Sequence, residues 1–210
     1  MIDKDTLLYG SFAKQAGSKG CKFFNTAFQK LEINAIYKSF SVDDISLAIQ
    51  AMKTLHMRAA AITMPFKREV LEYVDSVSKD VEMIGASNTI INNDGILHAE
   101  NTDWMSVKDM LESKQVKNLT ILGNGGYADA VKYACKLLDI TTTSITRSGW
   151  QEIESLKDIT VFNCTPVENI AIDESIDFIN CLTWTKTGAA LASAQSKYQF
   201  KIYTGKEYID

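Results

Sequence analysis

The segment 118–138 constrains the fold most, because an apolar strand, a glycine-rich loop and a helix follow one another directly. Residues 118–122 predict a short buried strand, and residues 127–138 place their apolar side chains at helical spacing. Between them lies Gly123-Asn124-Gly125-Gly126. Loop amides and a helix N-terminus in this order can bind a pyrophosphate, and the arrangement is typical of α/β proteins. The spacing is a variant of the dinucleotide fingerprint, so by itself it leaves both cofactor binding and a purely structural turn open.

A second segment ends a buried strand in a defined direction. Residues 59–62 are apolar, Pro65 is one of only two prolines in the chain, and Lys67 follows closely. Proline fixes its own φ and biases Met64 away from the helical region. The lysine would therefore lie at the carboxyl end of a strand, where open α/β sheets bind ligands. The alternative is a solvated lysine at the start of the next helix.

The first hundred residues alternate strands with helices, and this order implies parallel strands joined by right-handed crossovers. Asn93-Asp94-Gly95 between two alternating segments is a strong hairpin signal. The predicted strands are 6–11, 34–42, 58–63, 88–92 and 96–100, and the predicted helices are 21–31, 43–55, 68–74 and 78–84.

The second half continues the alternation after a predicted helix at 104–111. It predicts further strands at 141–146, 159–164, 176–182 and 199–204 and a helix at 187–196. We therefore predict an α/β protein with a mostly parallel N-terminal domain, residues 1–103, followed by a reduced Rossmann-type domain, residues 104–210.

Composition excludes several classes of function. A net charge of -4 over 210 residues argues against a protein that binds nucleic acid through its phosphates. No apolar run is long enough for a membrane span, and the charged N-terminus predicts a cytoplasmic protein. Four widely spaced cysteines without a Cys-x-x-Cys pair favour reduced thiols over disulfides or zinc, and two isolated histidines make a metal centre improbable.

The predicted strand 141–146 ends at Arg147. An NAD-type fingerprint has an acidic residue near this point for the ribose hydroxyl, whereas an arginine suits the 2′-phosphate of NADP. A surface arginine with no ligand is an equally good interpretation of this residue alone.

Five ordered motifs together resemble the shikimate dehydrogenase family. They are Ile62-Thr63-Met64-Pro65-Phe66-Lys67, Ile84-Gly85-Ala86-Ser87-Asn88-Thr89-Ile90, Asn101-Thr102-Asp103, Gly123-Asn124-Gly125-Gly126 and Asn163-Cys164-Thr165-Pro166. Residues 1–6 and 31–40 are most similar to the shikimate dehydrogenase-like branch, whose members need not prefer shikimate. The resemblance is tight to about residue 135 and loose beyond it.

The resemblance implies a two-domain enzyme that interconverts 3-dehydroshikimate and shikimate with NADP(H). Lys67 and Asp103 would be the catalytic pair, and Ser11, Thr63 and Asn88 would join them in contacting the substrate. The implied cofactor-binding residues are Gly123, Asn124, Gly125, Gly126, Arg147 and Thr165, the last beside the nicotinamide. Hydride transfer to a ketone builds negative charge on oxygen, which needs a nearby cation or proton donor. A lysine and a carboxylate that titrate as a unit can meet this need.

This chain departs from the family pattern in several places. Ala13 replaces the second serine of a Ser-x-Ser pair, Phe24 stands where the family has histidine, and Asn180 stands where it has tyrosine. The family continues beyond Tyr203 into a helix with a substrate-binding glutamine, which we expect to be missing here. Loss of a helix exposes apolar surface, so we predict a homodimer that covers it.

Two alternatives remain at the level of sequence. One is a catalytically weak or inactive relative that binds a nucleotide or small acid as a sensor or scaffold. The other is a chain that binds no cofactor, since a glycine loop alone does not guarantee affinity.

Overall fold

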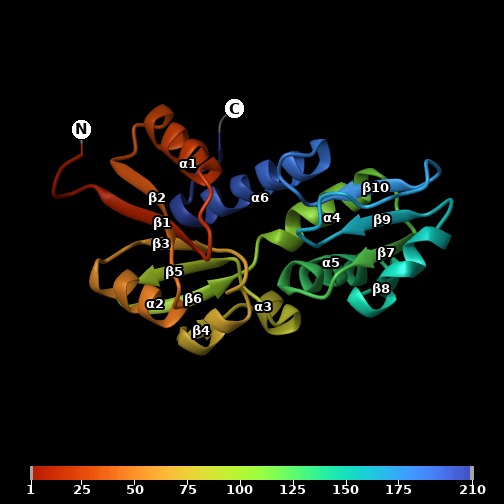
Figure 1. Cartoon of the computed structure of the whole chain (residues 1–210). Coiled ribbons are helices and arrows are strands. Elements are labelled where there is room, and N and C mark those ends of the chain that lie inside the picture. The colour runs from red at the N-terminus through yellow and green to blue at the C-terminus, as the bar shows by residue number, and fades with distance from the viewer. Residues whose placement is uncertain (1, 209–210) are drawn as a thin grey trace. The chain divides into compact units, whose positions relative to one another are not determined.

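The computed structural model describes residues 2–208, and the chain divides into two compact units (Figure 1). The first unit contains the chain up to Thr102 together with the segment from Ser196 onward, and the second is Asp103–Gln195. The prediction that residues 104–210 form one domain is therefore wrong for residues 196–208, which belong with the N-terminal half.

Within the described residues, the sheet of the first unit has six strands in the order β2-β1-β3-β5-β6-β4. The pairs β1–β2, β1–β3 and β4–β6 are parallel, and β3–β5 and β5–β6 are antiparallel. The strands are β1 (Leu7–Ala13), β2 (Ala35–Ser41), β3 (Ala59–Ile62), β4 (Ser76–Val77), β5 (Thr89–Asn93) and β6 (Ile96–Glu100). The helices are α1 (Lys19–Lys30), α2 (Ile45–Thr54), the 3-10 helix η1 (Glu69–Tyr73) and α3 (Lys79–Ile84).

Local sequence explains several of these boundaries. Asp44 caps α2, because its carboxylate accepts hydrogen bonds from the backbone amides of Ser46 and Leu47 at 2.7 and 3.2 Å. The predicted hairpin turn joins β5 to β6, and Asp94 and Gly95 both adopt positive φ, 52° and 96°. Positive φ at both central positions is what a type I′ turn requires.

The two faces of this sheet carry different cores. Phe12, Ile62 and Ile90 point to the face covered by α2 and η1. Neighbouring residues on the same strands point the other way, into an aromatic cluster made by Tyr9, Phe24, Phe28, Tyr37 and Phe200. This alternation is the two-residue period of a strand that is buried on both faces.

A 19-residue helix, α6 (Lys186–Thr204), occupies the segment for which we predicted a strand at 199–204. That prediction is wrong, and the end of this helix packs on the first unit. Phe200 is fully buried in the aromatic cluster, and Tyr203 stacks near Tyr9 with ring centroids 5.5 Å apart. Residues three apart share a face only in a helix, so the packing of this pair selects the helix over the strand.

In the second unit, the described strands form a parallel sheet in the order β10-β9-β7-β8. Helix α5 follows the central strand β7, as the opening sequence pattern predicts. The strands are β7 (Asn118–Leu122), β8 (Thr141–Ile145), β9 (Thr160–Asn163) and β10 (Asp177–Asn180), and the helices are α4 (Asp103–Ser113), α5 (Gly126–Leu137) and the 3-10 helix η2 (Arg147–Ser155). This parallel arrangement is Rossmann-like, and the α/β prediction is confirmed.

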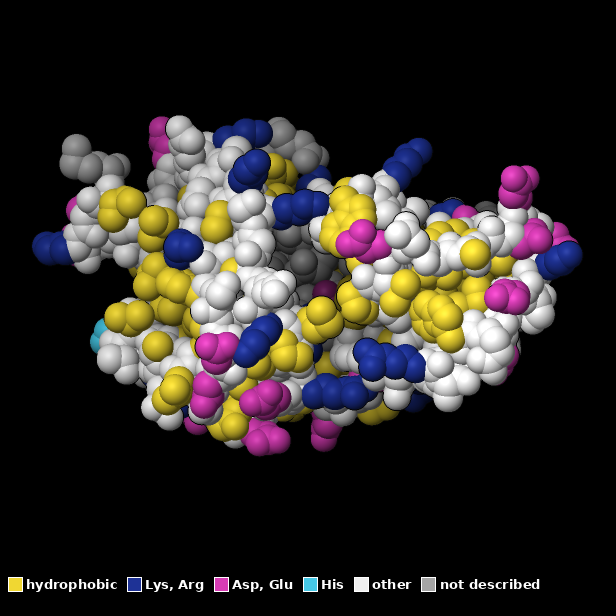
Figure 2. All heavy atoms as spheres, in the orientation of Figure 1, with side chains coloured by type: hydrophobic (Ala, Val, Ile, Leu, Met, Phe, Trp, Pro, Cys, Tyr) yellow, Lys and Arg dark blue, Asp and Glu magenta, His cyan; other side chains and the backbone are white. Residues whose placement is uncertain are grey.

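The visible surface carries lysine, arginine and acidic side chains interspersed with hydrophobic ones (Figure 2). The largest exposed hydrophobic side chains include Met64, Met83 and Trp184. Across residues 2–208, no helix combines the length and the apolar character that crossing a lipid bilayer would require.

Candidate functional site

A row of small residues, polar except for one alanine, crosses the first sheet toward the carboxyl ends of its parallel strands. Ser39 pairs in register with Ser11, Ser11 with Ala61, and Ala61 with Thr89. The preceding row on the same face is apolar and begins with Tyr37 and Tyr9. Two residues along each strand therefore separate the aromatic core from this row of mostly polar side chains, which we call the polar floor.

Ser11, a predicted substrate contact, lies on this floor and is 8% exposed. Its side chain is hydrogen-bonded with the hydroxyl of Tyr37, and burial raises the pKa of that phenol well above its usual value. Tyr37 therefore stays neutral and holds the serine hydroxyl in place. Sequence reasoning missed Tyr37 because its aromatic ring fits the core pattern of the strand.

The loop after β3 brings Thr63 and Lys67 next to the same edge. The backbone amide of Thr63 donates to the carbonyl of Phe12 in β1 at 3.0 Å, and the Met64–Pro65 peptide bond is cis. The carbonyl of Lys67 accepts from the backbone amide of Ser87 at 2.7 Å. This bond attaches the lysine to the segment that precedes Asn88.

Asn88 is the junction of the polar network in the first unit and is 3% exposed. Its amide oxygen accepts from the backbone amide of Thr102 and from the hydroxyl of Thr89, both at 2.8 Å. Its amide nitrogen donates to the hydroxyl of Thr102 at 3.0 Å. Thr102 is the last residue of this stretch of the first unit and immediately precedes Asp103 in the chain, so these bonds connect the segments of Lys67 and Asn88 to the residue before Asp103.

Gln199 closes this network from α6, and the sequence analysis did not single it out. Its side chain is 2% exposed, and its amide nitrogen donates to the carbonyl of Asn88 at 2.9 Å and to the hydroxyl of Thr89 at 2.8 Å. The helix and glutamine that we expected to be missing lie beyond Tyr203 in the family pattern, whereas Gln199 lies before that point, on α6, and reaches the backbone of Asn88.

In the second unit, Asp103 begins α4, is 5% exposed and lies near Tyr127 in the first turn of α5. Burial raises the pKa of the Tyr127 phenol well above its usual value. The negative charge of Asp103 adds to this effect, and so does the charge of Cys164 and Cys181 where they are ionised. Tyr127 is thus a neutral hydrogen-bonding group beside the predicted catalytic carboxylate, and no sequence motif had drawn attention to it.

The glycine-rich loop leaves β7 and enters α5 as predicted. Gly123 has a φ of +108°, and a Cβ there would lie 2.9 Å from Cγ2 of Thr165. Gly125 precedes the first residue of α5, no side chain caps the helix there, and a Cβ at Gly125 would meet nothing within 4 Å. Open space in front of an uncapped helix N-terminus fits a pyrophosphate. The side chain of Asn124 accepts a hydrogen bond from Lys132 at 2.9 Å.

Arg147 and Thr165 follow β8 and β9, on either side of the central strand β7. The point at which successive connections run to opposite sides of a parallel sheet is where such folds bind ligands. Arg147 is exposed, whereas the Thr165 hydroxyl donates to the buried side-chain oxygen of Asn163 at 2.7 Å. Asn163 in turn donates to Asn180, so the residue at the expected tyrosine position supports the Thr165 loop.

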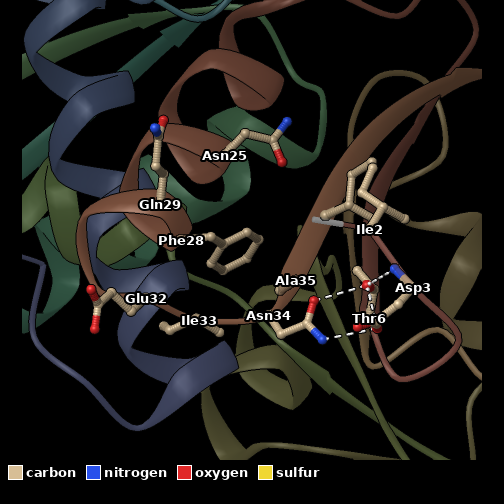
Figure 3. Close-up of a pocket in the computed structure, with 11 residues that line it drawn as sticks. Ile2, Asp3, Thr6, Asn25, Phe28, Gln29, Glu32, Ile33, Asn34 and Ala35 are labelled. Carbon is tan, nitrogen blue, oxygen red and sulfur yellow. Dashed lines mark hydrogen bonds between the residues drawn. The ribbon is translucent and has the colours of Figure 1, made fainter.

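A separate hollow of about 770 Å³ lies at the amino ends of β1 and β2 (Figure 3). Asn34 forms hydrogen bonds with Asp3 and Thr6 in its wall, and Asn25 is bonded to both backbone groups of Tyr37. These polar groups bind one another or the backbone, and the hollow lies at the opposite end of β1 from Ser11. We therefore assign it no role in the site. Among residues 2–208, no cluster of three or more potential metal ligands is present.

Comparison with known proteins identifies the family. The model of the shikimate dehydrogenase substrate binding domain matches residues 13–90, a range that contains Thr63, Lys67 and Asn88. The chain belongs to the shikimate dehydrogenase family.

Two curated relatives show the extent of the similarity. A shikimate dehydrogenase-like protein of Haemophilus influenzae is 37% identical over 139 residues, which is 65% of this chain and 51% of that protein. A shikimate dehydrogenase (NADP(+)) of Alkaliphilus oremlandii is 36% identical over 185 residues, 85% of this chain and 61% of that protein. The chain thus spans between half and two thirds of the length of these relatives.

Solved structures agree with the fold. A shikimate 5-dehydrogenase-like protein matches with a TM-score of 0.83 at 25% identity, covering 100% of this chain and 96% of that one. The shikimate dehydrogenase of Aquifex aeolicus matches with a TM-score of 0.87 at 24% identity, again covering 100% and 96%.

Proposed function

We propose that this protein is an NADP-dependent oxidoreductase that interconverts shikimate and 3-dehydroshikimate or a related cyclic hydroxy acid. The observation that carries the proposal is the Asn88 junction, which connects the loop of Lys67 to the residue before Asp103. A polyhydroxylated acid suits this polar floor, because every hydroxyl or amide left unpaired in a closed site is penalised.

In this proposal, NADP(H) would accept or supply the hydride when bound. The loop 123–126 and the N-terminus of α5 would hold its pyrophosphate, and Arg147 its 2′-phosphate. Lys67 and Asp103 would supply or accept the proton on the substrate oxygen. Ser11 and Thr63 would donate hydrogen bonds to the carboxylate and hydroxyls of the substrate.

A direct test mixes the protein with shikimate and NADP and follows the absorbance of the reduced nicotinamide. Lys67→Ala should abolish this signal without unfolding the protein, whereas Lys30→Ala, at an exposed position of α1, should leave it unchanged. Full activity of the Lys67 variant would refute the role given to this lysine. A panel of cyclic hydroxy acids with NADP and NAD would then define the substrate and cofactor.

A catalytically weak relative is the second candidate, and Ala13 favours it. This position ends β1 and lacks the hydroxyl that the family pattern supplies to the carboxylate. Such a protein would show a rise in melting temperature with NADP or shikimate and no turnover. Turnover at ordinary enzymatic rates would exclude this candidate.

The homodimer stays a prediction. It was based on apolar surface exposed by the loss of a helix beyond Tyr203, and α6, whose Phe200 is buried in the first unit, covers part of that unit. Sedimentation at micromolar concentration tests the oligomeric state directly.

A further inference from the structure

Two cysteines occupy matching positions at the carboxyl ends of adjacent strands in the second unit. Asn163 ends β9 and pairs in register with Asn180, which ends β10. Cys164 and Cys181 are the next residues, and the backbone amide of Cys181 donates to the carbonyl of Asn163 at 3.1 Å. The backbone hydrogen bonding between β9 and β10 therefore extends to the cysteines.

The strand register sets the distance between the Cα atoms of Cys164 and Cys181. Neighbouring strands lie about 4.8 Å apart, and a disulfide needs a separation of about 4.4–6.8 Å between its Cα atoms. Two residues in matching positions on adjacent parallel strands fall within this range.

Both thiols also lie on one face of the sheet. Phe162 and Ile179, two residues before each cysteine, point into the core packed against α4 and α5, and both cysteines pack against the same core. Side chains two apart on a strand share a face, so this packing agrees with the backbone register.

The environment keeps this pair accessible. Cys164 and Cys181 are each partly exposed, whereas Cys135 is 1% exposed, and burial raises the pKa of its thiol to about 12. Cys21 is partly exposed but belongs to the first unit, where it bonds to Ser39. Cys164 and Cys181 are thus the pair among the four that the fold places together.

We propose that Cys164 and Cys181 form a vicinal dithiol site that reacts with low-molecular-weight disulfides and closes to an intramolecular disulfide. One thiolate attacks the small disulfide RSSR, forms a mixed disulfide and releases one RSH. The second protein thiol then attacks the protein sulfur of the mixed disulfide and releases the other RSH. The two cysteines are oxidised, RSSR is reduced to two RSH, and the two thiol protons leave on the released thiols.

This site lies at the glycine-rich loop. A Cβ on Gly123 would lie 3.6 Å from both the carbonyl carbon and the carbonyl oxygen of Cys164. Oxidation of the pair therefore acts directly beside the first glycine of the loop. The proposal concerns the thiols alone and holds whether or not the chain binds NADP.

The experiment treats the reduced full-length protein with oxidised glutathione under native conditions and analyses it by intact mass and peptide mapping. The expected product is two hydrogens lighter and contains a peptide link between Cys164 and Cys181. Cys164→Ser and Cys181→Ser should each stop at the mixed disulfide, whereas Cys21→Ser and Cys135→Ser should still form the link.

Phenylarsine oxide, which bridges two neighbouring thiols, gives a second measurement. The reduced protein should bind one equivalent, and this equivalent should be lost in Cys164→Ser and in Cys181→Ser but kept in Cys21→Ser. Wild-type protein that carries glutathione on both cysteines without an internal link, or that binds no arsenical, would overturn the proposal. Neither readout involves nucleotide, so failure of the proposed dehydrogenase function leaves the result interpretable.

Discussion

Replacing Gln199 with methionine should measure how strongly α6 is attached to the polar floor of the first unit. The substitution keeps the length of the side chain and removes two hydrogen bonds, to the carbonyl of Asn88 and the hydroxyl of Thr89. Asn88 still accepts from the backbone amide of Ile62 at 2.8 Å, and Thr89 still donates to the Asn88 side chain. Neither group is left without any partner, so the loss is set by the two bonds themselves.

Each such bond contributes about 1 kcal/mol net, so Gln199→Met should lower the free energy of unfolding by about 2 kcal/mol. Urea unfolding followed by circular dichroism measures this value. The matched control is Gln50→Met, at an exposed position of α2, which should change stability by less than about 0.5 kcal/mol. A Gln199 variant as stable as the control would refute the assignment of both buried bonds.

Three further outcomes follow from the geometry. Gly123→Ala should destabilise the protein by about 1–3 kcal/mol because of its positive φ, whereas Gly125→Ala should preserve stability and weaken NADP binding; calorimetry with both variants distinguishes these effects. Closing the Cys164–Cys181 disulfide should raise the free energy of unfolding by about 3 kcal/mol, measured by comparing oxidised and reduced protein in urea. The hydrogen bonds from Ser46 and Leu47 lower the pKa of Asp44, so its stabilising effect is complete above the ordinary value of 3.8 and lost as pH falls through the lower folded pKa. Asp44→Asn keeps the cap, and its stability should fall less steeply over this acidic range; an equal slope contradicts the assignment.

The sequence predicted the alternation of strands and helices well where periodicity and turn chemistry agreed. Asp94-Gly95 signalled the hairpin, and the glycine loop signalled the connection from β7 to α5. It failed at residues 199–204, where Phe200, Ile202 and Thr204 alternate with polar or amphipathic residues as in a strand. The same segment has Phe200 and Tyr203 at helical spacing, and only their contacts in the aromatic cluster decide between the two patterns.

The surroundings of the candidate site residues could be predicted only in part. Motifs made Lys67 and Asn88 candidates, but the hydrogen-bond network around them depends on partners far away in the chain. Gln199 lies over a hundred positions from Asn88, and no spacing rule connects them. Cys164 and Cys181 likewise become neighbours only when β9 and β10 pair in register. Long-range pairings of this kind are properties of the folded sheet rather than of any local pattern.

The path of the chain through its two units has a consequence for synthesis. The first unit is interrupted after Thr102 and resumes at Ser196, within a single continuous helix. During translation the middle unit emerges whole before Gln199 and Phe200 leave the ribosome, so only α1 can cover the aromatic face of the earlier sheet at that time. Until α6 packs there, part of this face stays exposed, and at this stage a nascent chain is most open to aggregation or chaperone capture.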